Sequence, residues 1–187
     1  MSSEKNLQLP EHYKIDLTSK TLEEGTEKVA KEINAWATTG EFAGEEVVAV
    51  CILRGGVFFF SDLVRKLNFS LFLEFVTFSS YDEATNTQKS NKDLKEFHSP
   101  FDPKGKRIIL IDDILETGQT LEILSGKLLD LGALEVVTAV MVYRNTDATK
   151  SVPDFFATEI DHSTWLAGMG LDDSGLQRNL PDIYKIN

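Results

Sequence analysis

Two adjacent aspartates, Asp112 and Asp113, stand shortly before the segment Thr117-Gly118-Gln119-Thr120. Backbone N–H groups at the start of a helix, together with threonine hydroxyls, form a site suited to a phosphate group. Gly118 lets the backbone approach such a ligand closely, because glycine has no Cβ. Two carboxylates beside a phosphate would repel it unless they hold a metal ion or accept hydrogen bonds from sugar hydroxyls. The pattern therefore favours a phosphosugar site over a capped helix with solvated acids.

The elements that must position these residues alternate along the chain. Buried strands are predicted for apolar, β-rich runs at residues 47–53, 71–79, 107–111, 136–142 and 155–160. Helices are predicted at residues 57–67 and 117–131, and a capping box at residues 21–24 predicts the start of another that ends near Gly40. This alternation indicates an α/β fold, with a central, mostly parallel sheet and helices on both faces.

Ligands of such sheets bind beyond the carboxyl ends of the strands. This rule places several segments along one edge: Arg54-Gly55-Gly56, Ser79-Ser80-Tyr81, Asp112 to Thr120, and Arg144. The polar stretch at residues 81–105 has no clear period, which fits either a mobile lid or an ordinary insertion. We expect the tail from residue 162 onward to be irregular, apart from a short apolar segment at residues 183–186.

The segment from Asp112 to Thr120 resembles the phosphoribosyl-diphosphate binding motif of type I phosphoribosyltransferases. That motif places two acids, two apolar residues, an acid and Thr-Gly-x-Thr after an apolar strand. Leu53-Arg54-Gly55-Gly56 resembles the diphosphate loop of the 6-oxopurine (hypoxanthine-guanine) branch, which usually reads Leu-Lys-Gly-Gly and contains a cis peptide bond. Trp165-Leu166 and Leu171-Asp172 resemble the purine-binding segment of that branch, and Ser80-Tyr81 resembles the head of its mobile catalytic lid.

The resemblance runs from about residue 47 to the C-terminal end. It implies a single phosphoribosyltransferase domain over residues 1–187, with a core at about 40–150 and a mobile lid at about 80–105. A small hood would come from the chain ends, about 1–20 and 152–187. It also implies purine salvage, in which a 5-phosphoribosyl group passes from 5-phosphoribosyl 1-diphosphate to hypoxanthine or guanine and diphosphate leaves.

The resemblance assigns the donor side of the site residue by residue. The 5′-phosphate would lie on Thr117, Gly118, Gln119 and Thr120. The diphosphate would contact Arg54, Gly55 and Arg178. Asp112 and Asp113 would accept hydrogen bonds from the ribose hydroxyls and help to hold Mg²⁺, and Asp172 would contact a second Mg²⁺. Bond cleavage to the sugar builds negative charge on the diphosphate, which metal and fixed donors stabilise.

The base side is implied in the same way. Glu116 would act as general base toward the purine imidazole, and Arg144 would donate to the exocyclic oxygen. Trp165 would stack on the purine ring, with Leu166 and Asp172 beside it, and Ser80 and Tyr81 would close over the site. The family usually has aspartate where Glu116 stands and lysine where Arg144 stands. Both changes keep the charge, so they bear on rate and base preference, and a preference for xanthine stays open.

The composition limits the alternatives. The chain has 187 residues and a formal net charge of -11, which argues against general binding to nucleic acid or to an anionic membrane. A regulatory nucleotide-binding protein on the same fold should show a basic face, and the acidic balance argues against it. A dinucleotide-binding oxidoreductase should show G-x-G-x-x-G after a strand, and no predicted strand is followed by this pattern. The single cysteine, Cys51, is expected to be a core thiol. We expect a cytoplasmic protein, with a homodimer or homotetramer implied by the resemblance.

Overall fold

A parallel sheet forms the centre of the molecule. The computed structural model describes residues 9–77 and 100–186, and within them the five strands of this sheet run in the order β3-β2-β4-β5-β6. All neighbouring pairs are parallel. Their bounds are Val47–Leu53 (β2), Phe72–Thr77 (β3), Arg107–Leu115 (β4), Glu135–Arg144 (β5) and Phe155–Ile160 (β6). Parallel strands put all their carboxyl ends at one edge, where the predicted site lies.

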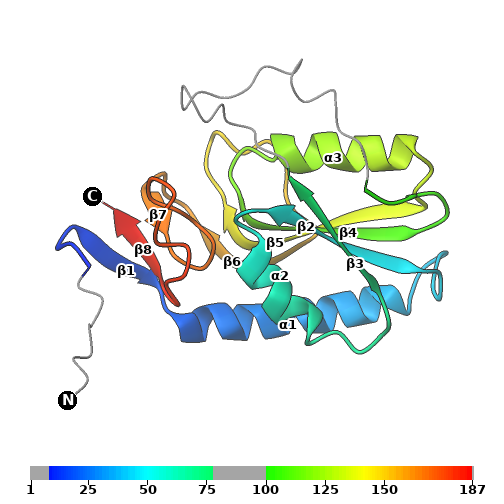
Figure 1. Ribbon diagram of the computed structural model, residues 1–187, viewed down its shortest axis with the longest axis horizontal. Coiled ribbons are helices and arrows are strands. Elements are labelled where there is room, and N and C mark those ends of the chain that lie inside the picture. The colour runs from blue at the N-terminus through cyan, green and yellow to red at the C-terminus, as the bar shows by residue number, and fades with distance from the viewer. Residues whose placement is uncertain (1–8, 78–99, 187) are drawn as a thin grey trace.

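Helices cover both faces of this sheet (Figure 1). Helices α1 (Ser19–Ala37) and α2 (Val57–Val64) pack on one face, and α3 (Gln119–Asp130) packs on the other. Strand β2 is apolar at every position because both of its faces are covered. Cys51 faces the α1 and α2 side, whereas Val50 and Ile52 face α3. The predicted fold class is thereby confirmed. No helix in the described part of the chain is long and apolar enough to span a membrane.

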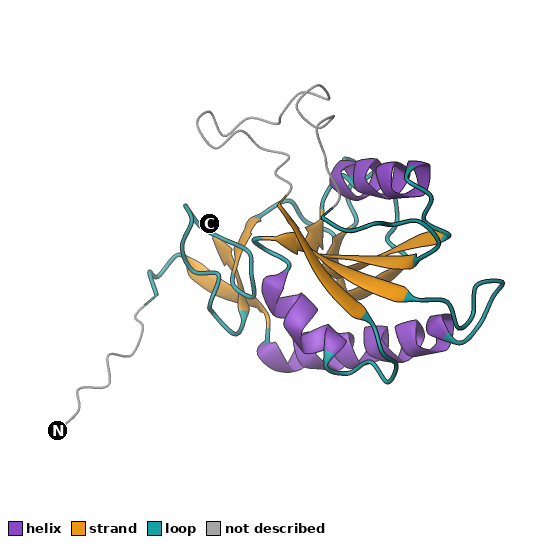
Figure 2. Cartoon of the chain, turned by 45° about the vertical axis from the view of Figure 1, so that its right-hand side comes forward, coloured by secondary structure: helices purple, strands orange, loops and turns teal. Residues whose placement is uncertain are grey.

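A second, smaller sheet joins the two ends of the chain. In the described residues it has three strands in the order β1-β8-β7, with antiparallel pairing throughout. These strands are Tyr13–Leu17 (β1), Trp165–Ala167 (β7) and Ile183–Ile186 (β8). We call this sheet the hood, and Figure 2 shows it beside the central sheet. The apolar segment noted at residues 183–186 is β8, but the expectation of an irregular tail was wrong at β7, because a strand this short is specified by a partner far away in the sequence.

The start of α1 and the end of β4 differ from the predicted boundaries. Helix α1 begins at Ser19 instead of at the predicted capping box, because Thr18 is the N-cap and accepts a hydrogen bond from the Thr21 N–H. The Ser19 N–H donates to Asp182 at 2.6 Å, a contact that the local sequence does not show. Strand β4 continues beyond the predicted end through Asp112 and Asp113 to Leu115, because it keeps pairing with β5. The acid pair therefore lies on rigid backbone.

Arg107, the first residue of β4, anchors the end of α1. Its side chain is 1% exposed, and its terminal nitrogens donate to the carbonyls of Ala37 and Trp36, each at 3.0 Å. Its Nε donates to Glu135 at 3.0 Å, and its guanidinium lies 3.8 Å from the centre of the Trp36 ring. A cation at the C-terminal end of a helix also interacts favourably with the helix dipole. Arg107 thus ties α1 to the edge of the sheet opposite the predicted site.

We predict that Arg107→Met lowers the free energy of unfolding by about 2–4 kcal/mol, because the buried carbonyls lose charged donors. Urea unfolding measures this loss. The matched control is Lys106→Met at the next residue, whose ion pair with Glu46 is at the surface. It should cost less than about 1 kcal/mol. Equal losses in the two variants would contradict the anchoring role of Arg107.

Candidate active site

Asp112 and Asp113 lie together near the carboxyl end of β4. The Asp113 N–H donates to the Asp112 carboxylate at 2.9 Å, and the Ile114 N–H donates to the Asp113 carboxylate at 2.8 Å. Burial raises the pKa of Asp112 well above its usual range, and the neighbouring charge of Asp113 raises it further. Burial also raises the pKa of Asp113, against the lowering effects of its hydrogen bonds and of Arg178. A cation would lower both pKa values, so the pair suits a divalent ion.

Cys51 lies in β2, close to these acids. Burial raises the pKa of its thiol to about 12, and the charges of Asp112 and Asp113 act in the same direction. The thiol is 0% exposed. Cys51 is therefore a core residue, as predicted, and a thiolate at this position is strongly disfavoured.

The glycine loop after β2 lies directly on the acid pair. The peptide bond between Leu53 and Arg54 is cis, as the resemblance implies. A Cβ atom on Gly55 would lie 1.8 Å from an oxygen of Asp113, so only glycine fits here without displacing the carboxylate. Gly170, on the other side, comes so close that its own Cβ would lie 2.0 Å from the Gly55 carbonyl oxygen. The loop is therefore held between the acid pair and the chain segment that follows β7.

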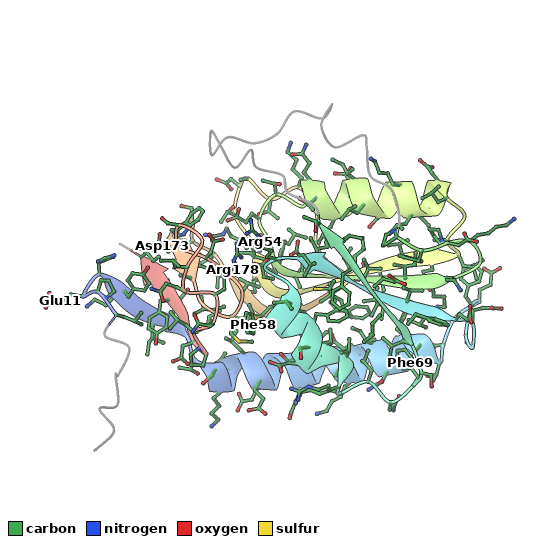
Figure 3. All side chains as sticks on the ribbon, viewed as in Figure 1. Glu11, Arg54, Phe58, Phe69, Asp173 and Arg178 are labelled. Carbon is green, nitrogen blue, oxygen red and sulfur yellow. The ribbon has the colours of Figure 1, made fainter. Side chains whose placement is uncertain are left out.

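Arg178, from the C-terminal segment, lies close to the glycine loop and the acid pair. It donates to the Gly170 carbonyl at 2.5 Å and forms an ion pair with Asp172 at 2.6 Å. Figure 3 shows Arg54 and Arg178 where the central sheet meets the hood. The predicted diphosphate-binding residues therefore come together, although they are far apart in the sequence.

The predicted phosphate segment forms a tight turn into α3. Gly118 is the N-cap of α3 with a φ of 84°, a conformation that favours glycine, and the Gln119 N–H lies 3.4 Å from the Thr117 hydroxyl. A Cβ on Gly118 would lie 1.9 Å from the Ser151 hydroxyl oxygen. The start of α3 at Gln119 and Thr120 is the kind of helix N-terminus that suits an anion.

The loop between β5 and β6 supports the turn before α3. The sequence did not indicate this support. The Thr149 hydroxyl donates to the Glu116 carbonyl at 2.8 Å and lies 2.5 Å from the Arg144 carbonyl, and the Lys150 N–H donates to the Thr117 carbonyl at 3.2 Å. Thr149 and Ser151 belong to no motif that we used. Their roles depend on the contact of the β5–β6 loop with the turn that follows β4, and no local sequence pattern predicts a contact between these two segments.

Glu116 and Arg144 face each other beside the phosphate turn. Glu116 Oε1 lies 3.2 Å from Arg144 Nε, close enough for an ion pair, but the N–H does not point at the oxygen and Nε forms no hydrogen bond among the described residues. The Arg144 side chain is buried, and its Nη1 donates to the carbonyls of His162 and Thr164 at 2.5 and 3.1 Å. The structure thus places the two departures from the usual family residues in direct contact.

Trp165 offers an open aromatic face near this pair. Its side chain is 55% exposed, and its Nε1 donates to the Asp172 carbonyl at 2.9 Å, which fixes the ring. The Leu166 side chain is buried in the core, so only its backbone could meet a ligand. The Asp172 carboxylate accepts from the Gly175 N–H at 2.7 Å and pairs with Arg178.

Two parts of the predicted site need separate comment. Ser80 and Tyr81 lie outside the residues that the structure describes. Asp172 pairs with Arg178, and in the described residues no group of three or more His, Cys, Asp or Glu side chains could hold a metal ion. Mg²⁺ is often bound through one or two carboxylates with substrate phosphates and water. The acid pair beside the glycine loop fits such an ion, with the remaining ligands from substrate and water.

The arrangement therefore combines a glycine turn at a helix start, a half-buried acid pair, a glycine loop with arginines in and near it, and an exposed aromatic ring near a carboxylate and a guanidinium. These features suit a phosphorylated, strongly anionic sugar on one side and a flat heterocycle on the other. The sugar carbon that reacts would lie between the side that suits the phosphorylated sugar and the side that suits the heterocycle.

Comparisons with known proteins agree with this arrangement. The hypoxanthine-guanine phosphoribosyltransferase of Staphylococcus aureus is 32% identical over 170 residues, which are 86% of this chain and 88% of that protein. The enzyme of that name from Aquifex aeolicus is 30% identical over 175 residues, covering 92% and 94%. The solved hypoxanthine phosphoribosyl transferase of Trypanosoma cruzi has a TM-score of 0.79 at 23% identity, covering 96% and 94%. The phosphoribosyl transferase domain model matches residues 18–174, and the chain belongs to that family.

Proposed function

We propose that this protein is a hypoxanthine-guanine phosphoribosyltransferase of purine salvage. It transfers the 5-phosphoribosyl group from 5-phosphoribosyl 1-diphosphate to hypoxanthine or guanine, forming the nucleoside monophosphate and diphosphate. Its curated relatives from Staphylococcus aureus and Aquifex aeolicus have this name and match most of the chain. The observation that carries the proposal is the contact of the Gly55 loop with both Asp113 and Gly170, which joins the donor side to the segment after Trp165.

The donor lies along the edge of the sheet in this account. Its 5′-phosphate accepts hydrogen bonds from the turn Thr117-Gly118-Gln119-Thr120, and its ribose hydroxyls donate to Asp112 and Asp113. The diphosphate lies against Gly55, with Arg54 and Arg178 supplying positive charge as the bond to the sugar breaks. The ion pair of Arg178 with Asp172 is 2.6 Å long, so Arg178 must share or exchange this partner when diphosphate binds.

Magnesium is the cofactor of the proposed reaction. Asp112 and Asp113 would hold it together with oxygens of the donor and water, and Asp172 is the candidate contact for a second ion. When bound, Mg²⁺ neutralises charge on the diphosphate. The burial that raises the pKa of Asp112 supports a cation near this pair.

The base lies between Trp165 and the contact of Glu116 with Arg144. Trp165 stacks on the ring, with the backbone of Leu166 and the segment at Asp172 beside it. Glu116 accepts the proton of the imidazole nitrogen that attacks the sugar. Arg144 Nη1 is committed to backbone carbonyls, which leaves Nη2 to donate to the 6-oxygen of the purine. This donor favours 6-oxopurines over 6-aminopurines.

The remaining roles concern water and assembly. Ser80 and Tyr81 close the site, because water competes with the purine for the cationic sugar. The three edge residues Phe72, Leu73 and Phe75 of β3 are 53%, 49% and 47% exposed, and a second copy of the chain would cover such a surface. We therefore propose a homodimer or homotetramer in the cytoplasm. The domain limits drawn from the sequence remain part of this proposal.

A purine panel tests the proposed function. The protein is incubated with 5-phosphoribosyl 1-diphosphate, Mg²⁺ and hypoxanthine, guanine, xanthine or adenine, and nucleotide formation is followed by ultraviolet absorbance. Turnover of hypoxanthine or guanine supports the proposal. Turnover of xanthine alone would replace it with the xanthine-preferring alternative. RNA binding without turnover of any purine would favour a regulatory protein.

We predict that Glu116→Gln lowers kcat by about 10²–10⁴-fold, because the amide cannot accept the purine proton, while the KM of the donor stays within a few fold. Glu116→Asp is the matched control, since it keeps a carboxylate and restores the usual family residue. It should retain substantial activity. Parental rates in both variants would mean that Glu116 does not carry the proton.

We predict that Trp165→Ala weakens purine binding by about 5–150-fold, the equivalent of 1–3 kcal/mol for a stacked base, and affects donor binding far less. Calorimetric titration with the nucleotide product gives the affinity. Trp165→Phe keeps a stacking ring but removes the N–H that donates to Asp172, so it separates stacking from this hydrogen bond. Unchanged affinity in the alanine variant would make Trp165 a structural residue only.

We predict that removal of divalent cations with a chelator abolishes turnover and that added Mg²⁺ restores it. The physical reason is the repulsion between the half-buried acid pair and the donor's phosphates in the absence of a cation. Initial rates at increasing free Mg²⁺ measure the dependence. Full activity in excess chelator would show that Asp112 and Asp113 need no metal.

A further inference from the structure

Asp16 is displaced from the regular pairing of the hood. Strand β1 pairs with β8 through Ile15 opposite Tyr184 and Leu17 opposite Ile183, so Asp16 is an extra residue in β1. An extra residue of this kind is a β-bulge, which turns a side chain away from its regular direction. The Asp16 side chain is 12% exposed and lies inward from the surface of the hood.

The Asp16 carboxylate joins two segments that follow β6 and β7. One oxygen lies 3.0 Å from His162 Nε2, and the other lies 2.8 Å from Lys185 Nζ in β8. The other ring nitrogen of His162, Nδ1, is buried and has no hydrogen-bond partner among the described residues. Asp16 is therefore the group that fixes the orientation of the imidazole ring.

His162 continues this connection to the base side of the active site. Its carbonyl oxygen accepts from Arg144 Nη1 at 2.5 Å, and the carbonyl of Thr164 accepts from the same nitrogen at 3.1 Å. Both carbonyls belong to the short segment between β6 and Trp165, the first residue of β7. A shift of this segment moves the acceptors that hold the guanidinium.

We propose that Asp16 is a positioning residue for base recognition: through His162 it fixes the carbonyls that hold Arg144 and so directs the guanidinium toward the 6-oxygen of the purine. This inference rests on the proposed function. It also gives the N-terminal strand, which carries no recognisable motif, a role in specificity. Asp16 itself touches neither substrate, because its contacts are His162 and Lys185.

Charge and burial favour this role over a plain surface ion pair. Exposed ion pairs contribute little and are screened by salt. Asp16 is largely buried, whereas the Lys185 side chain is 33% exposed and the His162 side chain is 23% exposed. A carboxylate held in this way orients its partners more strictly than a solvated one. Arg144 is equally enclosed, so small changes in its acceptors are not averaged out by solvent.

The experiment compares two nucleotides that differ at the 6-position and in the proton on N1 that the 6-oxo form carries. Inosine 5′-monophosphate has the 6-oxygen, and purine ribonucleoside 5′-monophosphate has hydrogen there. Calorimetry gives the affinity of the full-length protein for each nucleotide, and the change of the affinity ratio from parent to variant reports on recognition of the 6-oxo group. Stacking on Trp165 and binding of the phosphate cancel in this ratio. A loss of general stability in the hood therefore does not change it.

We expect Asp16→Ala to weaken inosine 5′-monophosphate about tenfold, roughly the loss of one hydrogen bond, and to leave the 6-hydrogen analogue within about twofold. Asp16→Asn keeps an acceptor oxygen for His162 and should recover most of the ratio. The matched control is Lys185→Met, which removes the other partner of Asp16 and should leave the ratio unchanged.

Equal weakening of the two nucleotides, or no weakening of either, would overturn the inference. His162→Ala provides a second route if Asp16→Ala does not fold, since it removes the ring but keeps the carbonyl and the pair of Asp16 with Lys185. It should reduce the ratio in the same way, and a parental ratio would overturn the inference. If the parent protein binds neither nucleotide, the proposed function fails. If the parent prefers the nucleotide with the 6-oxygen and the variants keep the same preference, only this inference fails.

Discussion

The partial burial of two adjacent carboxylates near the end of a parallel strand is the constraint around which the site is built. Asp112 and Asp113 sit on backbone that is still paired in the sheet, and burial raises the pKa of each. Such a pair is costly unless positive charge or hydrogen-bond donors compensate it. The Ile114 N–H and Arg178 do so in part, and a divalent cation with an anionic ligand would complete it.

The hood has a direct part in this compensation. Arg178 comes from the segment between β7 and β8, and Gly170 of the same segment touches the loop at Gly55. The proposed donor side and the proposed base side of the site therefore share one boundary. A ligand that spans this boundary would contact segments of both sheets.

The sequence predicted the parts whose signal is local. The apolar run of β2 and the span 155–160 of β6 agree with the structure, and the acid and threonine motif lies where parallel strands end. The hood was expected only from the resemblance, because strands such as β7, with three residues, show no periodicity of their own. The positions of Asp16, Thr149 and the pair of Asp172 with Arg178 depend on contacts between segments far apart in the chain. The roles of Ser80 and Tyr81 stay predictions.

The central claim is that one continuous site holds a sugar phosphate and a purine side by side. Competition by the nucleotide product tests it most directly, because inosine 5′-monophosphate contains both parts. Equilibrium displacement should show that this nucleotide excludes both 5-phosphoribosyl 1-diphosphate and hypoxanthine from the protein. Displacement of only one of them, with the other still bound, would place the two parts in separate sites and would contradict the account.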